Sequence, residues 1–222
     1  MSRLFKHCPG FEARGEDTTT YFYDRCPYCS RFHARCCQSQ LPHRICEEHP
    51  IVFVDGSCPG NGGLGARAGI GCAIGDDPKD QLCSPVTDTM DPGAPRTSQR
   101  AELLAALQGL RFLVCATSTA RYHPDCHAPL KCQHPMEYIV VADSEYVVKG
   151  MTEWVPQWKV RSSRCRQGKA PKNRDLFQRL EAAVSEYERQ GLKIQFFHVP
   201  REFNFIADGL AKRATAGPDV TL

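Results

Sequence analysis

Two stretches of the chain share one pattern, an unbroken run of apolar residues that is followed at once by an aspartate. The first run is Ile-Val-Phe-Val at 51–54, followed by Asp55, and the second is Tyr-Ile-Val-Val-Ala at 138–142, followed by Asp143. Short apolar runs rich in β-branched residues are typical of buried strands. We therefore predict two buried strands, each placing a carboxylate where the strand ends.

Further strands are predicted from small and branched residues. Residues 66–75 are expected to form a strand antiparallel to the first, and residues 193–199 another. Residues 76–96, which directly follow the first of these strands, are polar and contain several prolines, which favours a mobile loop or hairpin.

Helices are predicted where apolar side chains recur at helical spacing. This pattern runs from about residue 98 to 116, and again over 175–190, where one face is apolar and the other charged. Helical signals also cover 146–158, and a last helix holds residues 207–213.

The composition indicates one main domain with a small appendage. The chain has 222 residues, of which 41% are hydrophobic and 24% charged. We expect a Cys/His-rich extension at 1–49, the main domain at 50–217 and a frayed tail at 218–222. No apolar run approaches the roughly 20 residues of a membrane span, and the first residues lack the apolar core of a secretory signal. We therefore expect a monomer that contacts no membrane and acts inside the cell, in the nucleus, the cytoplasm or the mitochondrion.

The extension holds many of the thirteen cysteines of the chain, and without an export route these indicate free thiols or metal ligands. Cys26 and Cys29 form a CxxC, and Cys46 and His49 form a CxxH. Two such pairs can bind one structural zinc ion tetrahedrally. Rival ligands in the same segment are Cys36, Cys37, His33 and His43. The alternative is docking, in which residues 21–23 (Tyr-Phe-Tyr) add a strand to a sheet edge.

A second Cys/His-containing segment lies at 117–136. It carries His123, Cys126, His127, Cys132 and His134, but their spacing matches no metal site. We interpret it as a surface loop.

The densest positive charge lies between residues 159 and 174, where there is no acidic residue. Two tryptophans, Trp154 and Trp158, precede it. A solvated loop has such a composition, but aromatic side chains beside clustered arginine and lysine favour contact with a nucleic-acid backbone. The basic residues are Lys159, Arg161, Arg164, Arg166, Lys169, Lys172 and Arg174.

Four acids stand out by position. Asp55 and Asp143 follow strands, and Glu102 and Asp208 lie early in helices. Carboxylates brought together repel one another unless cations neutralise them, and all-oxygen ligands suit Mg²⁺ or Mn²⁺. Two such ions would activate a water and stabilise the leaving oxygen in phosphodiester cleavage.

The sequence segments around these acids resemble, in order, the four active-site motifs of the ribonuclease H family. They are Asp-Gly-Ser at 55–57 with Asn-Gly at 61–62, then 97–106 (TSQRAELLAA), 142–147 (ADSEYV) and 204–211 (NFIADGLA). Residues 150–159 and 172–176 are similar to the basic handle of the cellular type 1 enzymes, and 67–71 (RAGIG) resembles the eukaryotic ones. The resemblance spans about 50–215 and leaves the extension unexplained.

The resemblance implies an α/β fold, with a five-stranded mixed sheet and helices on both faces. It assigns two Mg²⁺ (or Mn²⁺) ions to Asp55, Glu102, Asp143 and Asp208, and an RNA–DNA hybrid as substrate. It also implies contacts with each strand of the hybrid. Those with the RNA strand, some of them to 2′-hydroxyls, fall to Cys58, Asn61, Ser98, Gln99 and Glu145, and those with the DNA strand to Thr97, Tyr146, Trp154, Trp158 and Asn173.

The sequence departs from the family pattern in three places. Ser98 stands where asparagine is usual, and the handle lacks its usual third tryptophan. The loop before Asp208 is short and contains no histidine, in the pattern Val-Pro-Arg-Glu-x-Asn at 199–204 that a plant-like branch of the family also has. We expect this loss to slow product release or proton transfer and to leave the metal core intact. His198 belongs to the preceding strand, and we interpret it as a packing residue.

The leading hypothesis is therefore endonucleolytic cleavage of the RNA strand of RNA–DNA hybrids, leaving 3′-hydroxyl and 5′-phosphate ends. The alternative is a weakly active or inactive module of the same fold that binds hybrids or structured RNA. The four acids favour the enzyme, and the missing histidine favours the binding module. A domain from a retroelement polyprotein is a third option, which the complete handle disfavours.

Overall fold

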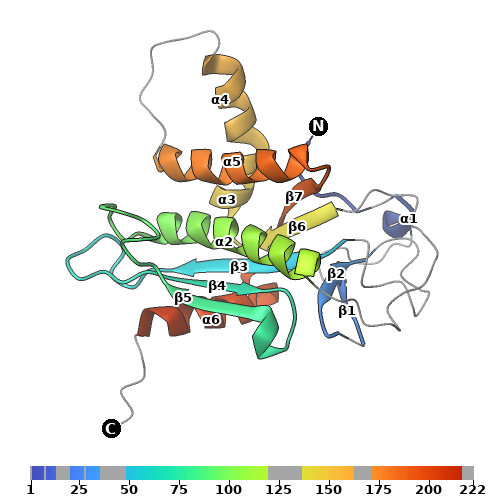
Figure 1. Ribbon diagram of the computed structural model, residues 1–222, viewed down its shortest axis with the longest axis horizontal. Coiled ribbons are helices and arrows are strands. Elements are labelled where there is room, and N and C mark those ends of the chain that lie inside the picture. Colours follow the sequence, from blue (N-terminus) through green and yellow to red (C-terminus); the bar gives the residue numbers. More distant parts are fainter. Residues whose placement is uncertain are drawn as a thin grey trace.

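The computed structural model describes residues 2–7, 9–13, 21–27, 29–35, 49–119, 137–162 and 172–216. A five-stranded sheet lies at its centre, in the order β5-β4-β3-β6-β7 (Figure 1). β3 pairs antiparallel with β4 and β4 with β5, whereas β3 with β6 and β6 with β7 are parallel. The predicted mixed sheet is confirmed. Its strands are β3 (Ile51–Ser57), β4 (Gly69–Ala73), β5 (Gln81–Pro85), β6 (Glu137–Ala142) and β7 (Lys193–His198).

One prediction about strands was wrong. β3 does not end before Asp55 but continues to Ser57, because Gly56 and Ser57 pair with Ile70 and Gly69 of β4. The stretch predicted as a mobile loop or hairpin contains β5, which follows a short 3₁₀ turn (Pro78–Asp80) and pairs antiparallel with β4. β5 is a short edge strand with one neighbour and only partly buried side chains, so its sequence shows no apolar run.

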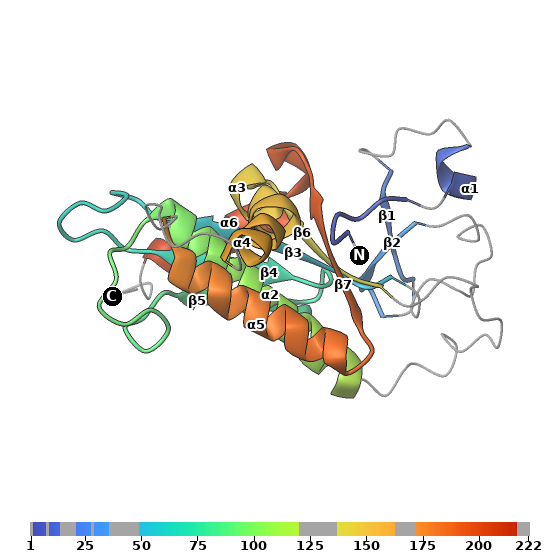
Figure 2. The ribbon, with the colours of Figure 1, turned by 90° about the horizontal axis from the view of Figure 1, so that it is seen from above.

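Helices cover both faces of the sheet. α2 (Ser98–Thr119) lies on one face with α5 (Arg174–Arg189) packed beside it, and α6 (Phe205–Ala216) lies on the other (Figures 1 and 2). Side chains of β3 alternate between these layers, with Val52 and Val54 in the core under α2, and Ile51 and Phe53 in the second core with α6. The one described stretch with the length and hydropathy of a membrane span is Ser98–Ser118 of α2, and it is mostly buried as the central core helix.

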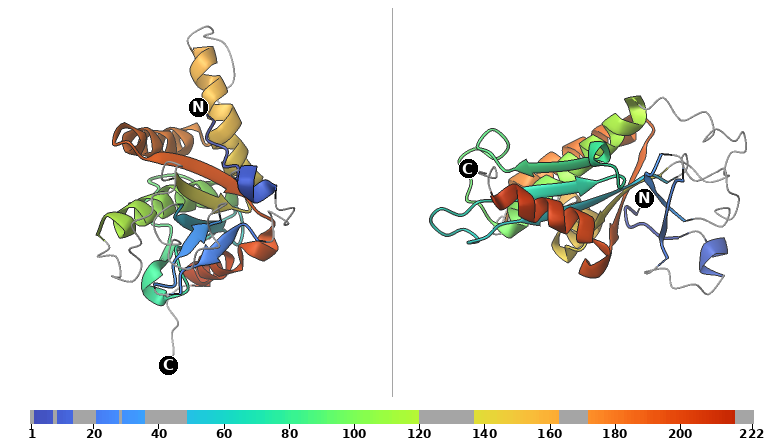
Figure 3. Two further views of the ribbon diagram at one scale, coloured as in Figure 1. Left: turned by 90° about the vertical axis from the view of Figure 1, so that its right-hand side faces the viewer. Right: turned by 90° about the horizontal axis from the view of Figure 1, so that it is seen from below.

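The predicted handle begins with three successive helical segments. They are α3 (Glu145–Lys149), a π-helical turn (Gly150–Trp154) and α4 (Val155–Ser162), which projects from the body of the molecule (Figure 3). Gly150 is required where this segment crosses α5, because a Cβ there would lie 2.1 Å from the ring of Phe177.

The described part of the extension is docked on the main domain. It contains α1 (Pro9–Glu12) and the antiparallel pair β1 (Tyr23–Arg25) and β2 (Phe32–Ala34). Phe22 and Phe32 are buried in the core that also holds Phe5 and Phe53. The strand-like contact with the sheet edge comes from the first residues rather than from 21–23, since the Phe5 amide donates to the Phe196 carbonyl of β7 at 3.0 Å. Docking of the extension by aromatic packing is therefore present.

Candidate active site

The four predicted acids come from four elements that meet at one end of the sheet. Asp55 lies in β3, Asp143 follows β6, and Glu102 and Asp208 lie in α2 and α6. Gly56 permits this meeting, because a Cβ there would lie 2.2 Å from the backbone of Ala101 and Glu102. Only glycine lets the start of α2 approach β3 this closely, which brings Glu102 toward Asp55.

Asp55 is the electrostatic centre of the group. Burial first, and then the charges of Asp143, Asp208 and Glu102, raise the pKa of Asp55 to about 7. The side chain is 7% exposed. A carboxyl whose pKa responds to three other acids lies within electrostatic reach of all of them, so the predicted constellation is brought together.

Glu102 is held by a neighbouring hydroxyl. Burial raises the pKa of Glu102, and a hydrogen bond donated by Ser144 Oγ to its carboxylate partly opposes this rise. Ser144 follows Asp143 in the chain, so this bond ties the end of β6 to α2.

Asn204 is a functional candidate that the sequence reasoning did not single out. Its side chain is fully buried, and its Nδ2 donates to Asp143 Oδ1 at 2.8 Å and to the Val54 carbonyl at 2.9 Å. Asn204 thereby fixes the Asp143 carboxylate against β3. The signal was its place in the fourth motif, immediately before α6.

The loop before α6 supplies a cation beside Asp208. Arg201, in a 3₁₀ turn (Arg201–Phe203), donates to Asp208, and Lys212 pairs with the other Asp208 oxygen at 2.6 Å. Partial burial would raise the pKa of Asp208, but the bonds from Lys212 and Arg201 lower it. The charge of Arg201 also opposes the raised pKa values of Asp55 and Glu102. Sequence reasoning missed this role, although Arg201 stands in the quoted pattern.

His198 lies close to the acids and is not one of the predicted catalytic residues. Its Nε2 lies 3.2 Å from the carbonyl oxygen of Asp143. This contact fits a residue that supports the backbone at the end of β6.

The donor set fits hard divalent cations. All four acids offer oxygen only, and among them Asp208 forms ion pairs, with Arg201 and Lys212. Among the described residues, no three His, Cys, Asp or Glu side chains are grouped closely enough to hold a metal ion as they stand. The raised pKa of Asp55 marks the charge that a bound cation would neutralise.

The residues predicted to contact the RNA strand gather at the start of α2, with one exception. Asn61 Oδ1 accepts from the Ser98 amide at 3.0 Å, which ties the glycine-rich turn after β3 to α2. Gln99 is exposed beside it, and Cys58 is buried. Glu145 stands apart in α3, where it is exposed and pairs with Lys149 at 2.6 Å.

The residues predicted for the DNA strand form a neighbouring group. Tyr146 lies between Trp154 and Asn173, with its ring 5.5 Å from that of Trp154 and its hydroxyl 3.1 Å from Asn173 Nδ2. Trp158 joins this group through Phe177, whose ring it contacts edge-on at 5.5 Å and which also packs against Tyr146 and Trp154. Thr97 Oγ1 accepts from the Arg100 amide at 3.3 Å, at the start of α2.

The described basic residues of the handle differ in their pairing. Lys159 pairs with Glu181 of α5, and Lys172 is exposed. Arg164, Arg166 and Lys169, and the side chain of Arg161, lie outside the described residues.

The proposed zinc ligands are described only in part. Cys26 is buried and Cys29 half-buried in the turn between β1 and β2, His49 is buried before β3, and Cys46 lies outside the described residues. The rival ligand His33 is buried beside Cys29, and burial lowers its pKa. The insertion predicted at 117–136 is described only as far as residue 119, in α2.

Comparisons with known proteins agree with this arrangement. The family model for RNase H matches residues 47–216. The chain is 31% identical over 170 residues to a ribonuclease H of Pseudomonas paraeruginosa, covering 77% of this chain and 95% of that protein. It is 29% identical over 166 residues to the ribonuclease H1 of Mus musculus, covering 75% of this chain and 48% of that protein. A solved structure of the foamy viral protease-reverse transcriptase in complex with dsDNA aligns with a TM-score of 0.50 at 18% identity, over 74% of this chain and 92% of that one, and shows a shared fold.

Proposed function

Because the chain belongs to the ribonuclease H family, we propose that it is a metal-dependent endonuclease that hydrolyses the RNA strand of RNA–DNA hybrids. The observation that carries the proposal is the meeting of Asp55, Glu102, Asp143 and Asp208 at one end of the sheet, where burial and then the charges of the other three acids raise the pKa of Asp55. The products are a 3′-hydroxyl and a 5′-phosphate end.

The four acids would hold Mg²⁺ or Mn²⁺. Bound there, such ions supply an activated water and stabilise the leaving oxygen of the phosphodiester. The residues around the acids keep the carboxylates in place. Asn204 orients Asp143 through its amide, Ser144 donates to Glu102, and Arg201 and Lys212 limit the repulsion at Asp208.

Recognition of the RNA strand is proposed for the start of α2 and the glycine-rich turn. Cys58, Asn61, Ser98 and Gln99 supply backbone and side-chain groups there, and 2′-hydroxyls distinguish RNA from DNA at such a surface. Glu145 is the remaining candidate, with an exposed side chain on α3.

The DNA strand is proposed to cross Tyr146 and Trp154 and to place one phosphate at Thr97 and Asn173. The handle then follows the backbone with its basic residues, which is a contact of charge rather than of sequence. Trp158 supports this surface by packing on Phe177.

A labelled RNA–DNA hybrid tests the proposal directly. Incubation with Mg²⁺ should give cleavage of the RNA strand, with no cleavage in EDTA and none of matched RNA or DNA duplexes. Asp55→Asn and Asp143→Asn should each abolish cleavage but retain binding of the hybrid in Ca²⁺, since most of the binding energy comes from backbone contacts. Tight binding by wild-type protein without any cleavage would establish the alternative, a binding module of this fold.

We also propose one structural zinc ion in the extension, held by Cys26, Cys29, Cys46 and His49, with His33 as the nearest described rival for His49. Support comes from the buried positions of Cys26 and His49 and from the small apolar content of the segment. Metal analysis of the untagged protein should give about one zinc per chain, lost in Cys26→Ser/Cys29→Ser. A folded, zinc-free protein would leave aromatic docking as the sole support of the extension.

An intracellular site of action and a monomeric state complete the proposal. Among the described cysteines, Cys58, Cys72 and Cys83 form no disulfide, which fits a reducing compartment. Imaging of the tagged protein and light scattering would test these two points.

A further inference from the structure

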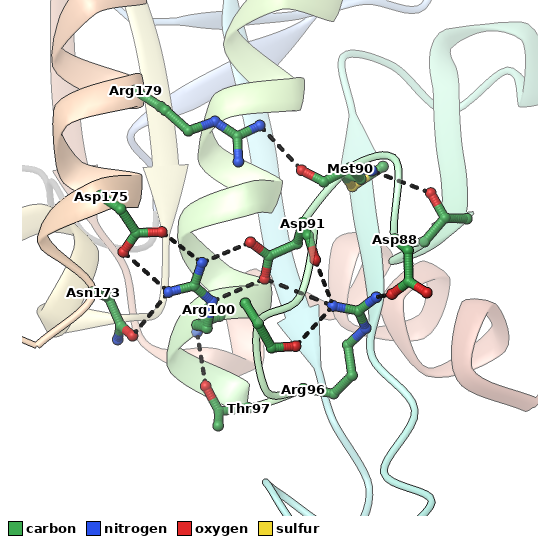
Figure 4. Close-up of polar contacts among 11 residues, drawn as sticks. Asp88, Met90, Asp91, Arg96, Thr97, Arg100, Asn173, Asp175 and Arg179 are labelled. Atoms are coloured by element: carbon green, nitrogen blue, oxygen red, sulfur yellow. Dashed lines mark hydrogen bonds and ion pairs between the residues drawn. The ribbon is translucent and has the colours of Figure 1, made fainter.

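A loop between β5 and α2, residues 86–96, is fixed to the rest of the protein by two arginines, and a third arginine holds it together from within. Arg179 of α5 donates to the Met90 carbonyl at 3.1 Å, and Arg96 donates to the Asp91 carbonyl at 2.9 Å (Figure 4). Arg100 of α2 donates to both carboxylate oxygens of Asp91, at 2.8 and 2.6 Å. The loop therefore has a defined position above the start of α2, although its sequence predicts mobility.

The pair formed by Asp91 and Arg100 is buried. Asp91 is 2% exposed and Arg100 7% exposed. A guanidinium bound to a carboxylate through two parallel hydrogen bonds has its plane fixed as well as its position. Asp91 thereby determines the direction of the remaining N–H groups of Arg100.

Those remaining groups point to the start of α5. Arg100 Nη2 and Nη1 donate to the Asp175 carboxylate at 2.6 and 3.1 Å, and Nη1 also lies 3.4 Å from Asn173 Oδ1 (Figure 4). Asn173 is in the left-handed backbone conformation, with φ 54°, where an L-residue is strained and needs support from its surroundings. Arg100 supplies part of that support.

Asn173 in turn touches groups proposed to meet each strand of the hybrid. Its Nδ2 donates to the Tyr146 hydroxyl at 3.1 Å and to Gln99 Oε1 at 3.5 Å. The Arg100 amide contacts Thr97 Oγ1, the other member of the phosphate pocket. One arginine thus contacts both Thr97 and Asn173, the first through its backbone and the second through its buried guanidinium.

We propose that Asp91 is a positioning residue for the pocket that binds a phosphate of the DNA strand: by fixing the guanidinium of Arg100, it sets the separation and orientation of Thr97 and Asn173. This inference rests on the proposed function, because it assumes that a hybrid occupies the pocket. Asp91 itself touches no substrate. A role in stability alone is the competing explanation, so the test needs a measurement specific to one phosphate.

The test compares Asp91→Asn with the matched control Asp88→Asn. Asp88 lies in the same loop and pairs with Arg96, but its side chain is 91% exposed and does not contact Arg100. Affinity is measured in Ca²⁺ for a set of hybrids in which one DNA phosphate at a time is replaced by a neutral methylphosphonate. Wild-type protein should lose affinity most at the one position that lies in the pocket.

In Asp91→Asn, we expect KM for the unmodified hybrid to rise roughly three- to tenfold, with kcat within about twofold, as for loss of one or two oriented hydrogen bonds. The loss of affinity caused by a methylphosphonate at the pocket position should fall toward the loss caused at neighbouring positions. Asp88→Asn should behave as wild type. Arg100→Lys keeps the charge but not the paired hydrogen bonds. It should show the same changes as those expected of Asp91→Asn, and it replaces that variant as the test if Asp91→Asn does not fold.

Two results would overturn the inference while leaving the proposed function intact. In the first, wild-type protein cleaves hybrids and loses affinity most at one methylphosphonate position, and Asp91→Asn and Arg100→Lys show the same loss at that position. The other is an equal loss of affinity at every position, which indicates general destabilisation. A wild-type protein that neither binds nor cleaves hybrids would instead refute the proposed function.

Discussion

The four acids make a prediction about stability that needs no substrate: in the absence of divalent metal, Asp55→Asn should stabilise the protein. The pKa of Asp55 is raised from 3.8 to about 7 in the folded protein by burial and by its three acidic neighbours. A carboxyl with a raised folded-state pKa favours folding only while protonated. Its ionisation therefore costs stability progressively from about pH 4 to pH 7, and the full cost applies above pH 7.

The size of this cost follows from the shift. About three pKa units correspond to roughly 4 kcal/mol at pH 8 as an upper limit. Asparagine has nearly the same volume and no charge, but its amide still loses solvation on burial. We therefore expect Asp55→Asn to gain about 1–3 kcal/mol at pH 8 in EDTA, or several degrees in Tm. At pH 4 the gain should vanish.

Urea unfolding followed by the fluorescence of Trp154 and Trp158 measures this difference at both pH values. Asp88→Asn, with a nearly fully exposed side chain, is the matched control and should change stability by less than about 0.5 kcal/mol. Added Mg²⁺ should stabilise wild type more than Asp55→Asn, because only the complete set of acids binds it well. If Asp55→Asn is no more stable than wild type at pH 8 in EDTA, the acids do not repel one another as described.

Three further predictions concern the handle, the extension and the acid site. Neutralising Arg161, Arg164, Arg166 and Lys169 should reduce the slope of log affinity against log salt by roughly one for each phosphate that these side chains neutralise in the wild type, with kcat at saturating hybrid little changed; an unaltered slope would show that this surface does not touch nucleic acid. Phe22 is 1% exposed and packs against Phe53 and Phe197, so Phe22→Ala should lower the free energy of unfolding in urea by about 3–5 kcal/mol. Tyr21→Ala removes an exposed ring and should change it little. Equal effects of the two substitutions would contradict docking of the extension. Asn204→Ala should lower kcat at least tenfold with KM nearly unchanged, measured by hydrolysis of the hybrid, because Asp143 loses the amide that orients it; a wild-type kcat would remove Asn204 from the site.

The sequence by itself determined the strands β3, β4, β6 and β7, the main helices and the positions of the four acids. These features are local. A strand buried on both faces needs a continuous apolar run, and a packed helix needs apolar side chains that recur at the helical repeat. Each sequence motif also places its acid at a fixed position in a strand or helix. Asp55 and Asp143 therefore follow from a few neighbouring residues.

Only the tertiary structure decided the edge strand, the docking of the extension and the supporting contacts of the site. β5 forms on one neighbour and carries little apolar signal, so its existence depends on β4. Phe22 gains its burial from Phe53 and Phe197, which belong to distant strands.

The same holds for the polar network. Arg100 and Asp175 are 75 residues apart, and neither residue type predicts the other as its partner. Ion pairs and amide hydrogen bonds depend on distances of about 3 Å between atoms that only the completed packing brings together. For this reason the chain's own sequence identifies the four acids of the candidate site, whereas the groups that hold them in place emerge from the fold.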